Sequence, residues 1–183
     1  MNRMVFLLLA ATLVVGAFAV DSFATQVIQK SPQELAQVSQ LVVDGKVQSV
    51  RSYWNDDHSK IFTEALVDVA ATHKGSAAQS VRVVQPGGVV GNVRMTAHGA
   101  LQWKKGEEVL LFLEPATPGA YQVAGFSQGK FLIERDPQTG TPFVTQAMPP
   151  DTDAKTSANG TTTAARTEKL TLEQFLDRVL PNE

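Results

Sequence analysis

Two short stretches of the chain combine residue types that could carry out chemistry. The first, Gly125-Phe126-Ser127-Gln128-Gly129, matches the G-x-S-x-G pattern of serine hydrolases. In those enzymes a helix follows the serine, and the catalytic histidine comes later in the chain. Here "KFLIER" follows and predicts a second strand, while His58, His73 and His98 all precede Ser127. We therefore predict a turn between two strands, and nucleophilic catalysis by Ser127 is kept only as an alternative.

The second stretch is "WNDDHSK", residues 54–60. From Asn55 to Ser59 every second residue carries an oxygen donor, as in calcium-binding loops. However, Lys60 stands where the EF-hand turn requires glycine, and Leu66 stands where its bidentate glutamate is required. The stretch therefore predicts a polar hairpin tip rather than a metal site.

Other cofactor chemistry finds little support in the sequence. The chain has no cysteine, which excludes thiolate catalysis and cysteine-ligated metals. The three histidines are spaced by fifteen and twenty-five residues, which matches no local zinc pattern. We predict no catalytic residue, metal or cofactor. The candidates for contact with a partner are Trp54, Asp56, Asp57, His58, Trp103 and Gln128.

The elements that must position these residues are mostly strands. Seven segments rich in β-branched and apolar residues follow one another at close spacing, and no helix of crossover length separates them. "EEVLLFLEP" is almost continuously apolar, as in a buried central strand. We predict a mainly β fold: an antiparallel OB-like barrel or sandwich of about seven strands. A short helix precedes it, with Ser31 and Glu34 forming a capping box around Pro32.

The N-terminus predicts export. Residues 4–20 carry no charge and follow Arg3, and small residues lead up to Ala24. This is typical of a signal peptide, residues 1–24, with cleavage after Ala24 or, as second choice, after Ala19. An uncleaved anchor is the alternative, because the apolar run approaches the roughly 18 residues of a spanning helix. We predict a periplasmic or secreted bacterial protein without a stable membrane span after processing.

The whole chain of 183 residues has room for one domain. We assign the barrel to residues 25–145 and a flexible linker to residues 146–168, which are poor in large apolar residues. Residues 169–183 predict an amphipathic C-terminal helix, capped by Thr171 and Gln174. Its apolar stripe is expected to dock on the barrel or on a partner. That stripe consists of Leu172, Phe175, Leu176, Val179 and Leu180.

The order of these motifs resembles a group of exported bacterial proteins of unknown role. The likeness spans residues 31–135 and rests on the capped helix, "LVVDGKVQSV", "IFTEALVDVAATHKG", "KKGEEVLLFLEP" and "GKF". The same order is similar to the netrin-like module of tissue inhibitors of metalloproteinases, an OB-type five-stranded barrel. That resemblance implies protein binding and, by extension, protease inhibition. Those inhibitors bind zinc through an N-terminal cysteine, which this chain lacks, so zinc chelation through Thr25 is not carried over.

The sequence thus predicts an exported, non-enzymatic β-barrel module that binds a protein or envelope component. A protease inhibitor acting through exposed loops is the alternative. The formal net charge of -2 gives no basic excess, so nucleic acid is not expected as a partner.

Overall fold

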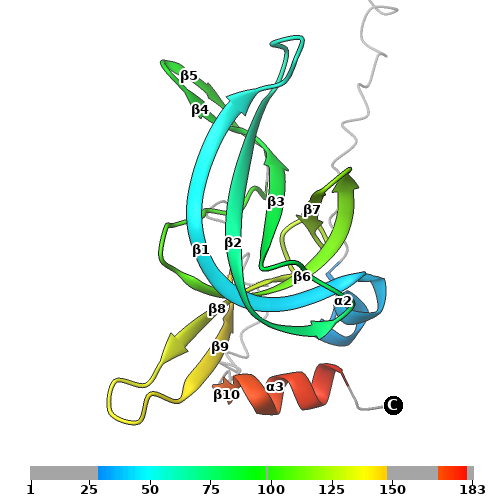
Figure 1. Cartoon of the computed structure of the whole chain (residues 1–183), viewed down its shortest axis with the longest axis vertical. Helices are drawn as coiled ribbons and strands as arrows, with labels where there is room; N and C mark the ends of the chain where they lie inside the picture. Colours follow the sequence, from blue (N-terminus) through cyan, green and yellow to red (C-terminus); the bar gives the residue numbers. More distant parts are fainter. Residues whose placement is uncertain (1–28, 98, 148–168, 181–183) are drawn as a thin grey trace, which may run out of the picture.

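The computed structural model describes residues 29–97, 99–147 and 169–180. These residues form two helices and ten strands (Figure 1). In chain order the elements are α2 (Pro32–Val38), β1 (Leu41–Trp54), β2 (Ile61–Lys74), β3 (Ser80–Pro86), β4 (Gly88–Val90), β5 (Val93–Met95), β6 (Glu108–Thr117), β7 (Ala120–Val123), β8 (Lys130–Arg135), β9 (Pro142–Gln146), β10 (Leu170–Thr171) and α3 (Leu172–Val179). Neither helix within these described ranges has the length and apolar character needed to cross a membrane.

The predicted mainly β fold with a helix near each end is confirmed, but the count of about seven strands is not. The additional strands are β4, β9 and β10. Each is short, and each is defined by pairing with a partner strand: β4 with β5, β9 with β8, and β10 with β9. Their sequences alone are too short to show a strand period.

Both helices begin with the predicted capping boxes. The Ser31 hydroxyl accepts a hydrogen bond from the Glu34 amide, and the Glu34 side chain accepts one from the Ser31 amide. Thr171 and Gln174 make the same reciprocal pair at the start of α3. These bonds satisfy amides that a helix leaves without partners, so each helix has a fixed first residue.

Eight strands form one sheet in the order β1-β2-β3-β7-β6-β8-β9-β10. Because β1 also pairs with β6, the pairings join β1, β2, β3, β7 and β6 into a ring. The predicted all-antiparallel arrangement is wrong at one place, since β3 and β7 are parallel and pair only Val83 with Tyr121. The β4–β5 hairpin and β6 intervene between β3 and β7, and after them the chain returns in the direction of β3.

Two apolar clusters lie on opposite faces of β6. Leu111 and Leu113 belong to a cluster inside the ring, with Val67 of β2 and Val83 of β3. Leu110 and Phe112 point the other way, into a second cluster under α2, α3, β8 and β9. All five residues from Val109 to Leu113 are buried, which confirms the predicted central strand and explains why its sequence does not alternate.

Strand β1 can pair with both β2 and β6 because it bends near Gly45. Its first half pairs with β6 and its whole length pairs with β2, with a register shift between Asp44 and Gly45. A Cβ atom at Gly45 would overlap the backbone carbonyl of Asp68 on β2. Glycine therefore permits the close approach of the two backbones at the bend.

Helix α3 docks on the β-sheet domain, which is one of the two positions expected for it. Phe175 is buried in the second cluster, where its ring centroid lies 4.8 Å from that of Phe131 and 6.4 Å from that of Phe112. Val179 is buried in the same cluster, and the other stripe leucines pack against it. The helix begins at Leu172, directly after its predicted cap Thr171, and Leu170 and Thr171 form the short strand β10.

The predicted linker begins too early. Gln146 belongs to β9, and the Ala147 amide donates a hydrogen bond to the Lys130 carbonyl, 2.9 Å away. Residues 148–168 of the linker and the predicted signal peptide lie outside the described residues.

Candidate binding surface

The β1–β2 hairpin reaches the end of the molecule opposite α3, and its tip is residues 55–60 (Figure 1). Four of the predicted partner-contact residues are here: Trp54, Asp56, Asp57 and His58. The structure thus confirms the predicted polar hairpin turn, and these four residues, which are also neighbours in the sequence, lie at or directly beside its tip.

The tip is held in shape by its own polar groups. The Asn55 amide donates to the Lys60 carbonyl and the Lys60 amide donates to Asn55 Oδ1, at 2.9 and 2.8 Å. Asp57 Oδ1 accepts from the Ser59 hydroxyl at 2.7 Å and from the Ser59 amide at 3.0 Å, and these bonds lower the pKa of Asp57. His58 has a left-handed φ of 54° and stacks on Trp54, with ring centroids 6.2 Å apart. The tip therefore presents its aromatic pair and its carboxylates in a defined arrangement.

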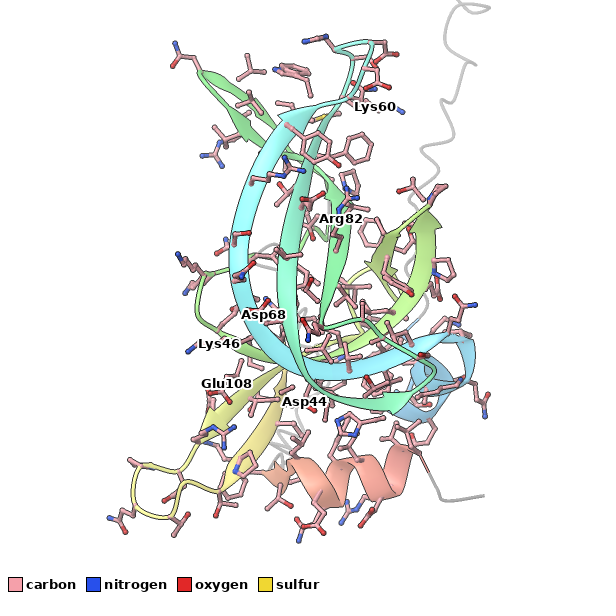
Figure 2. The ribbon with its side chains drawn as sticks, viewed as in Figure 1. Asp44, Lys46, Lys60, Asp68, Arg82 and Glu108 are labelled. Carbon is pink, nitrogen blue, oxygen red and sulfur yellow. The ribbon has the colours of Figure 1, made fainter. Side chains whose placement is uncertain are left out.

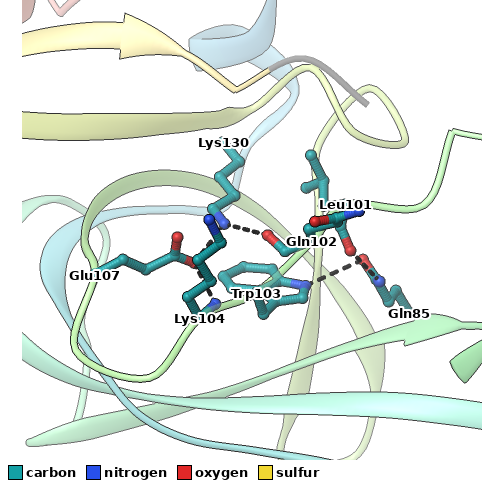
Figure 3. A network of polar contacts seen from close by, with 7 residues as sticks. All are labelled: Gln85, Leu101, Gln102, Trp103, Lys104, Glu107 and Lys130. Atoms are coloured by element: carbon teal, nitrogen blue, oxygen red, sulfur yellow. Dashed lines mark hydrogen bonds and ion pairs between the residues drawn. The ribbon is translucent and has the colours of Figure 1, made fainter. Parts of the chain in front are cut away.

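Trp103 lies away from the tip, in a polar network beside the interior of the ring (Figure 3). Its indole Nε1 donates to Gln85 Oε1 at 3.1 Å, and Lys130 Nζ lies 4.2 Å from its ring centroid. Lys130 is 1% exposed and donates to Glu107 Oε1 at 2.5 Å and to the Gln102 carbonyl at 2.7 Å. Burial lowers the pKa of Lys130, while its hydrogen bond to Glu107 opposes that shift. Trp103 is thus half-buried and covers a buried ion pair.

Gln128 and Ser127 lie in the turn between β7 and β8. Strand β8 follows the turn, so the strand–turn–strand arrangement predicted for the G-x-S-x-G match is confirmed. Ser127 is buried, and Gln128 Oε1 accepts from the Lys30 amide at 2.7 Å, which attaches the start of the described chain to this turn. Gly125 has a φ of 62°, and a Cβ there would lie 2.8 Å from a Leu35 methyl group. The glycine therefore serves the turn and its contact with α2.

The sequence did not reveal a second surface, formed by side chains on the outward side of β1, β2 and β3. We call it the outward face; it consists of Arg51, Tyr53, Phe62, Glu64, Arg82 and Val84. The strand registers put them there: Arg51 lies opposite Glu64, Tyr53 lies opposite Phe62, and Glu64 lies opposite Val84. The alternate residues of β2, such as Ala65 and Val67, are buried on the other side.

Glu64 is the centre of the outward face. Its side chain is 8% exposed and accepts from Arg51 Nε at 2.8 Å, and from Arg82 Nε and Nη2 at 3.0 and 2.7 Å. The hydrogen bond from Arg51, supported by Arg82, holds the pKa of Glu64 below its usual value against the effect of burial. The arginine side chains remain 66% and 47% exposed. One buried carboxylate thus fixes two accessible guanidinium groups, with a net charge of one positive unit.

Aromatic and apolar side chains border this ion cluster. The rings of Tyr53 and Phe62 stack at 6.3 Å, and the Arg51 guanidinium lies 5.4 Å from the Tyr53 centroid. On the other side, a cleft of about 260 Å³ opens between β3 and β7. It is lined by Val84, Gln85, Pro86, Gly99, Ala100, Gln122, Val123 and Phe126. Figure 2 shows Arg82 on β3 between the tip, marked by Lys60, and the bent end of the hairpin near Asp44 and Asp68.

His58 and His73 lie at opposite ends of the β1–β2 hairpin, so the two histidines that the structure describes are not gathered at one site. His73 instead contacts Asp44, with its Nε2 2.6 Å from Oδ1. Searches against protein-family models and against curated proteins return no match to this chain.

Proposed function

We propose that the protein is an exported, non-enzymatic binding module of the OB-like barrel type, whose partner is a protein or an envelope component. The ring order β1-β2-β3-β7-β6, with a parallel contact between β3 and β7, supports the barrel assignment. The apolar run of residues 4–20 and the missing cysteines support export to the periplasm or the medium. The resemblance to exported bacterial proteins is consistent with export, and the resemblance to netrin-like modules is consistent with the barrel.

The observation that carries the proposal is the outward face. Arginine and tyrosine are the residue types enriched at protein interfaces, and here they are anchored on a sheet. Arg51 and Arg82 are each fixed by Glu64, so little side-chain entropy is left to lose when a partner binds. The neighbouring cleft and the Tyr53–Phe62 stack add apolar area.

A photocrosslinking amino acid at Tyr53, in the protein expressed in its own cell envelope, tests the proposal. We expect adducts of one defined size, which disappear when Arg51 and Arg82 are both changed to glutamine. The matched control is the same crosslinker at Glu173, an exposed position on α3 at the other end of the molecule. Equal patterns from both positions, or no adduct from Tyr53, would contradict the proposal.

The ordered tip supports a second candidate, a protease inhibitor that acts through exposed loops. The hydrogen bonds of Asn55 and Asp57 hold the tip in one conformation, as an inhibitory loop requires in order to resist cleavage. Such an inhibitor suppresses a metalloprotease at a one-to-one ratio, and Trp54→Ala weakens the suppression. Cleavage within residues 55–60 without loss of protease activity would exclude it.

The alternative of a serine hydrolase is tested separately. If Ser127 only supports the turn, a fluorophosphonate probe leaves the protein unlabelled and Ser127→Ala leaves binding unchanged. Stoichiometric labelling that disappears in Ser127→Ala would establish a nucleophile.

A further inference from the structure

The arginine pair and the cleft are joined by one strand. Arg82, Val84 and Pro86 alternate along the outward side of β3, and Val84 and Pro86 line the cleft. The cleft therefore begins two to four residues from Arg82, which corresponds to about 7–13 Å at 3.3 Å per residue. A ligand in extended conformation that lies along β3 can reach both features.

The two guanidinium groups keep donors for such a ligand. Arg51 uses Nε, and Arg82 uses Nε and Nη2, to bind Glu64. Within the described part of the chain, no further acceptor is recorded for either group, and about two thirds of the Arg51 side chain and about half of the Arg82 side chain are exposed. A guanidinium fork matches a carboxylate or a phosphate, and binding at a charge that is already held in place loses little entropy.

The charge around the site favours a carboxylate over a polyanion. The cluster of Arg51, Glu64 and Arg82 carries one net positive charge, which one carboxylate neutralises. The tip carries Asp56 and Asp57 against the single lysine Lys60, and Glu114 lies next to Gln122. The whole chain carries a formal net charge of -2. A polyanion needs several clustered cations to bind, and these acidic neighbours would repel it.

The cleft favours an apolar side chain. It exists because β3 and β7 pair only at Val83 and Tyr121 and then separate. Phe126 borders it with a left-handed φ of 71° and is 52% exposed, so its ring is accessible to a ligand at the cleft. An apolar cavity of about 150 Å³ already accepts benzene, so a cleft of about 260 Å³ can take a phenylalanine or leucine side chain.

We propose that the outward face binds an extended segment of a protein partner, in which one carboxylate and one large apolar side chain are two or four residues apart. The carboxylate is held by Arg82 and Arg51, and the apolar side chain enters the cleft beside Val84 and Phe126. Even spacing is required because side chains of an extended chain alternate between its two faces. This inference names the ligand of the surface on which the proposed binding function rests.

Fluorescence anisotropy of labelled peptides with the purified protein tests the proposal. The probes are Gly-Ser-Glu-Ser-Phe-Ser-Gly and the same peptide with three serines between glutamate and phenylalanine. Their controls are a peptide with two serines between them, a peptide with glutamine for glutamate, and one with alanine for phenylalanine. We expect each control to bind at least about tenfold more weakly. Glutamine weakens the charged hydrogen bonds to the arginines, alanine loses the burial of the apolar ring, and the odd spacing turns one of the two side chains away from its place.

Protein variants assign the effect to the site. In Arg82→Gln the advantage of the glutamate peptide over the glutamine peptide shrinks, because only Arg51 is left to hold the carboxylate. Phe126→Ala weakens binding of the phenylalanine peptide but not of the alanine peptide. Arg178→Gln, an exposed arginine on α3, is the matched control and leaves all affinities unchanged. Thermal unfolding shows which variants remain folded, and the comparison between peptides on the unaltered protein does not depend on any variant.

Equal binding of the glutamate and glutamine peptides, equal binding at even and odd spacing, or no binding at millimolar peptide would each overturn the inference. If Tyr53 adducts still form while the peptides fail, the binding function stands and only the ligand class is wrong. If the adducts are also missing, both proposals fail.

Discussion

Replacement of Lys130 by methionine provides a direct test of the network in Figure 3. The side chain is 1% exposed, and its Nζ lies 2.5 Å from Glu107 Oε1. Methionine preserves most of the volume but leaves Glu107 without its cation. Loss of one partner from a buried ion pair costs about 3–5 kcal/mol. In this variant Glu107 keeps a hydrogen bond from the Lys104 amide, and its side chain is 15% exposed. We therefore expect the free energy of unfolding to fall by an amount near the lower limit, about 3 kcal/mol.

A double-mutant cycle separates the pair from the rest of the network. Glu107→Gln alone leaves Lys130 buried without a counter-charge, and we expect a loss of at least about 2 kcal/mol. The double variant buries no unpaired charge, so its loss should be near 2 kcal/mol, chiefly from the unsatisfied Gln102 carbonyl. Urea unfolding followed by near-ultraviolet circular dichroism measures all three variants, because Trp103 reports on the site. If the single losses add up in the double variant, the two groups are not coupled and the interpretation is wrong.

The same lysine predicts a pH dependence. Burial puts the pKa of Lys130 in the folded protein below its ordinary value of 10.5. Between these two values the unfolded chain binds more protons than the folded chain, so stability due to this group rises with pH in that window. Lys130→Met should lack this rise. An identical alkaline slope in both proteins would contradict the assigned direction.

Three further changes test other parts of the fold. Gly45→Ala puts a Cβ against the β2 carbonyl and should lower the free energy of unfolding in urea by about 3 kcal/mol. Gly91→Ala is its control: a Cβ there meets open space but φ is 58°, so the free energy of unfolding should fall by about 1 kcal/mol. Phe175→Ala removes a buried ring and should lower the free energy of unfolding by about 3–5 kcal/mol. Phe126 is exposed, so Phe126→Ala should lower it by less than about 0.5 kcal/mol. A decrease below about 1 kcal/mol for Phe175→Ala would mean that α3 does not stabilise the core. The pKa of Glu64 in the folded protein is below its ordinary value of 4.5. Its contribution to folding stability is therefore complete above pH 4.5 and is lost as the pH falls through the lower pKa of the folded protein. Glu64→Gln should therefore reduce the acid sensitivity of unfolding, and an unchanged acid profile would contradict this.

Features with a local physical cause could be predicted from the sequence. Ser31 and Thr171 start their helices because a side-chain oxygen satisfies an amide three residues away. The polar tip at residues 55–60 and the turn at Ser127 follow from residue types that disfavour continued strands. The apolar run of β6 indicated burial on both faces. In each case the interacting groups are close in the chain.

Features that depend on strand register and on enclosure were decided by the tertiary structure. Arg51, Glu64 and Arg82 come from three strands, and only the pairing of β1, β2 and β3 brings them together, since a shift by one residue would turn each side chain to the other face. The parallel contact of β3 with β7 depends on the path of the intervening chain. Lys130 has the sequence context of a surface lysine. It is buried because Glu107, Gln102 and Trp103 arrive from a separate segment and supply the charge and the acceptors that its ammonium group needs away from water.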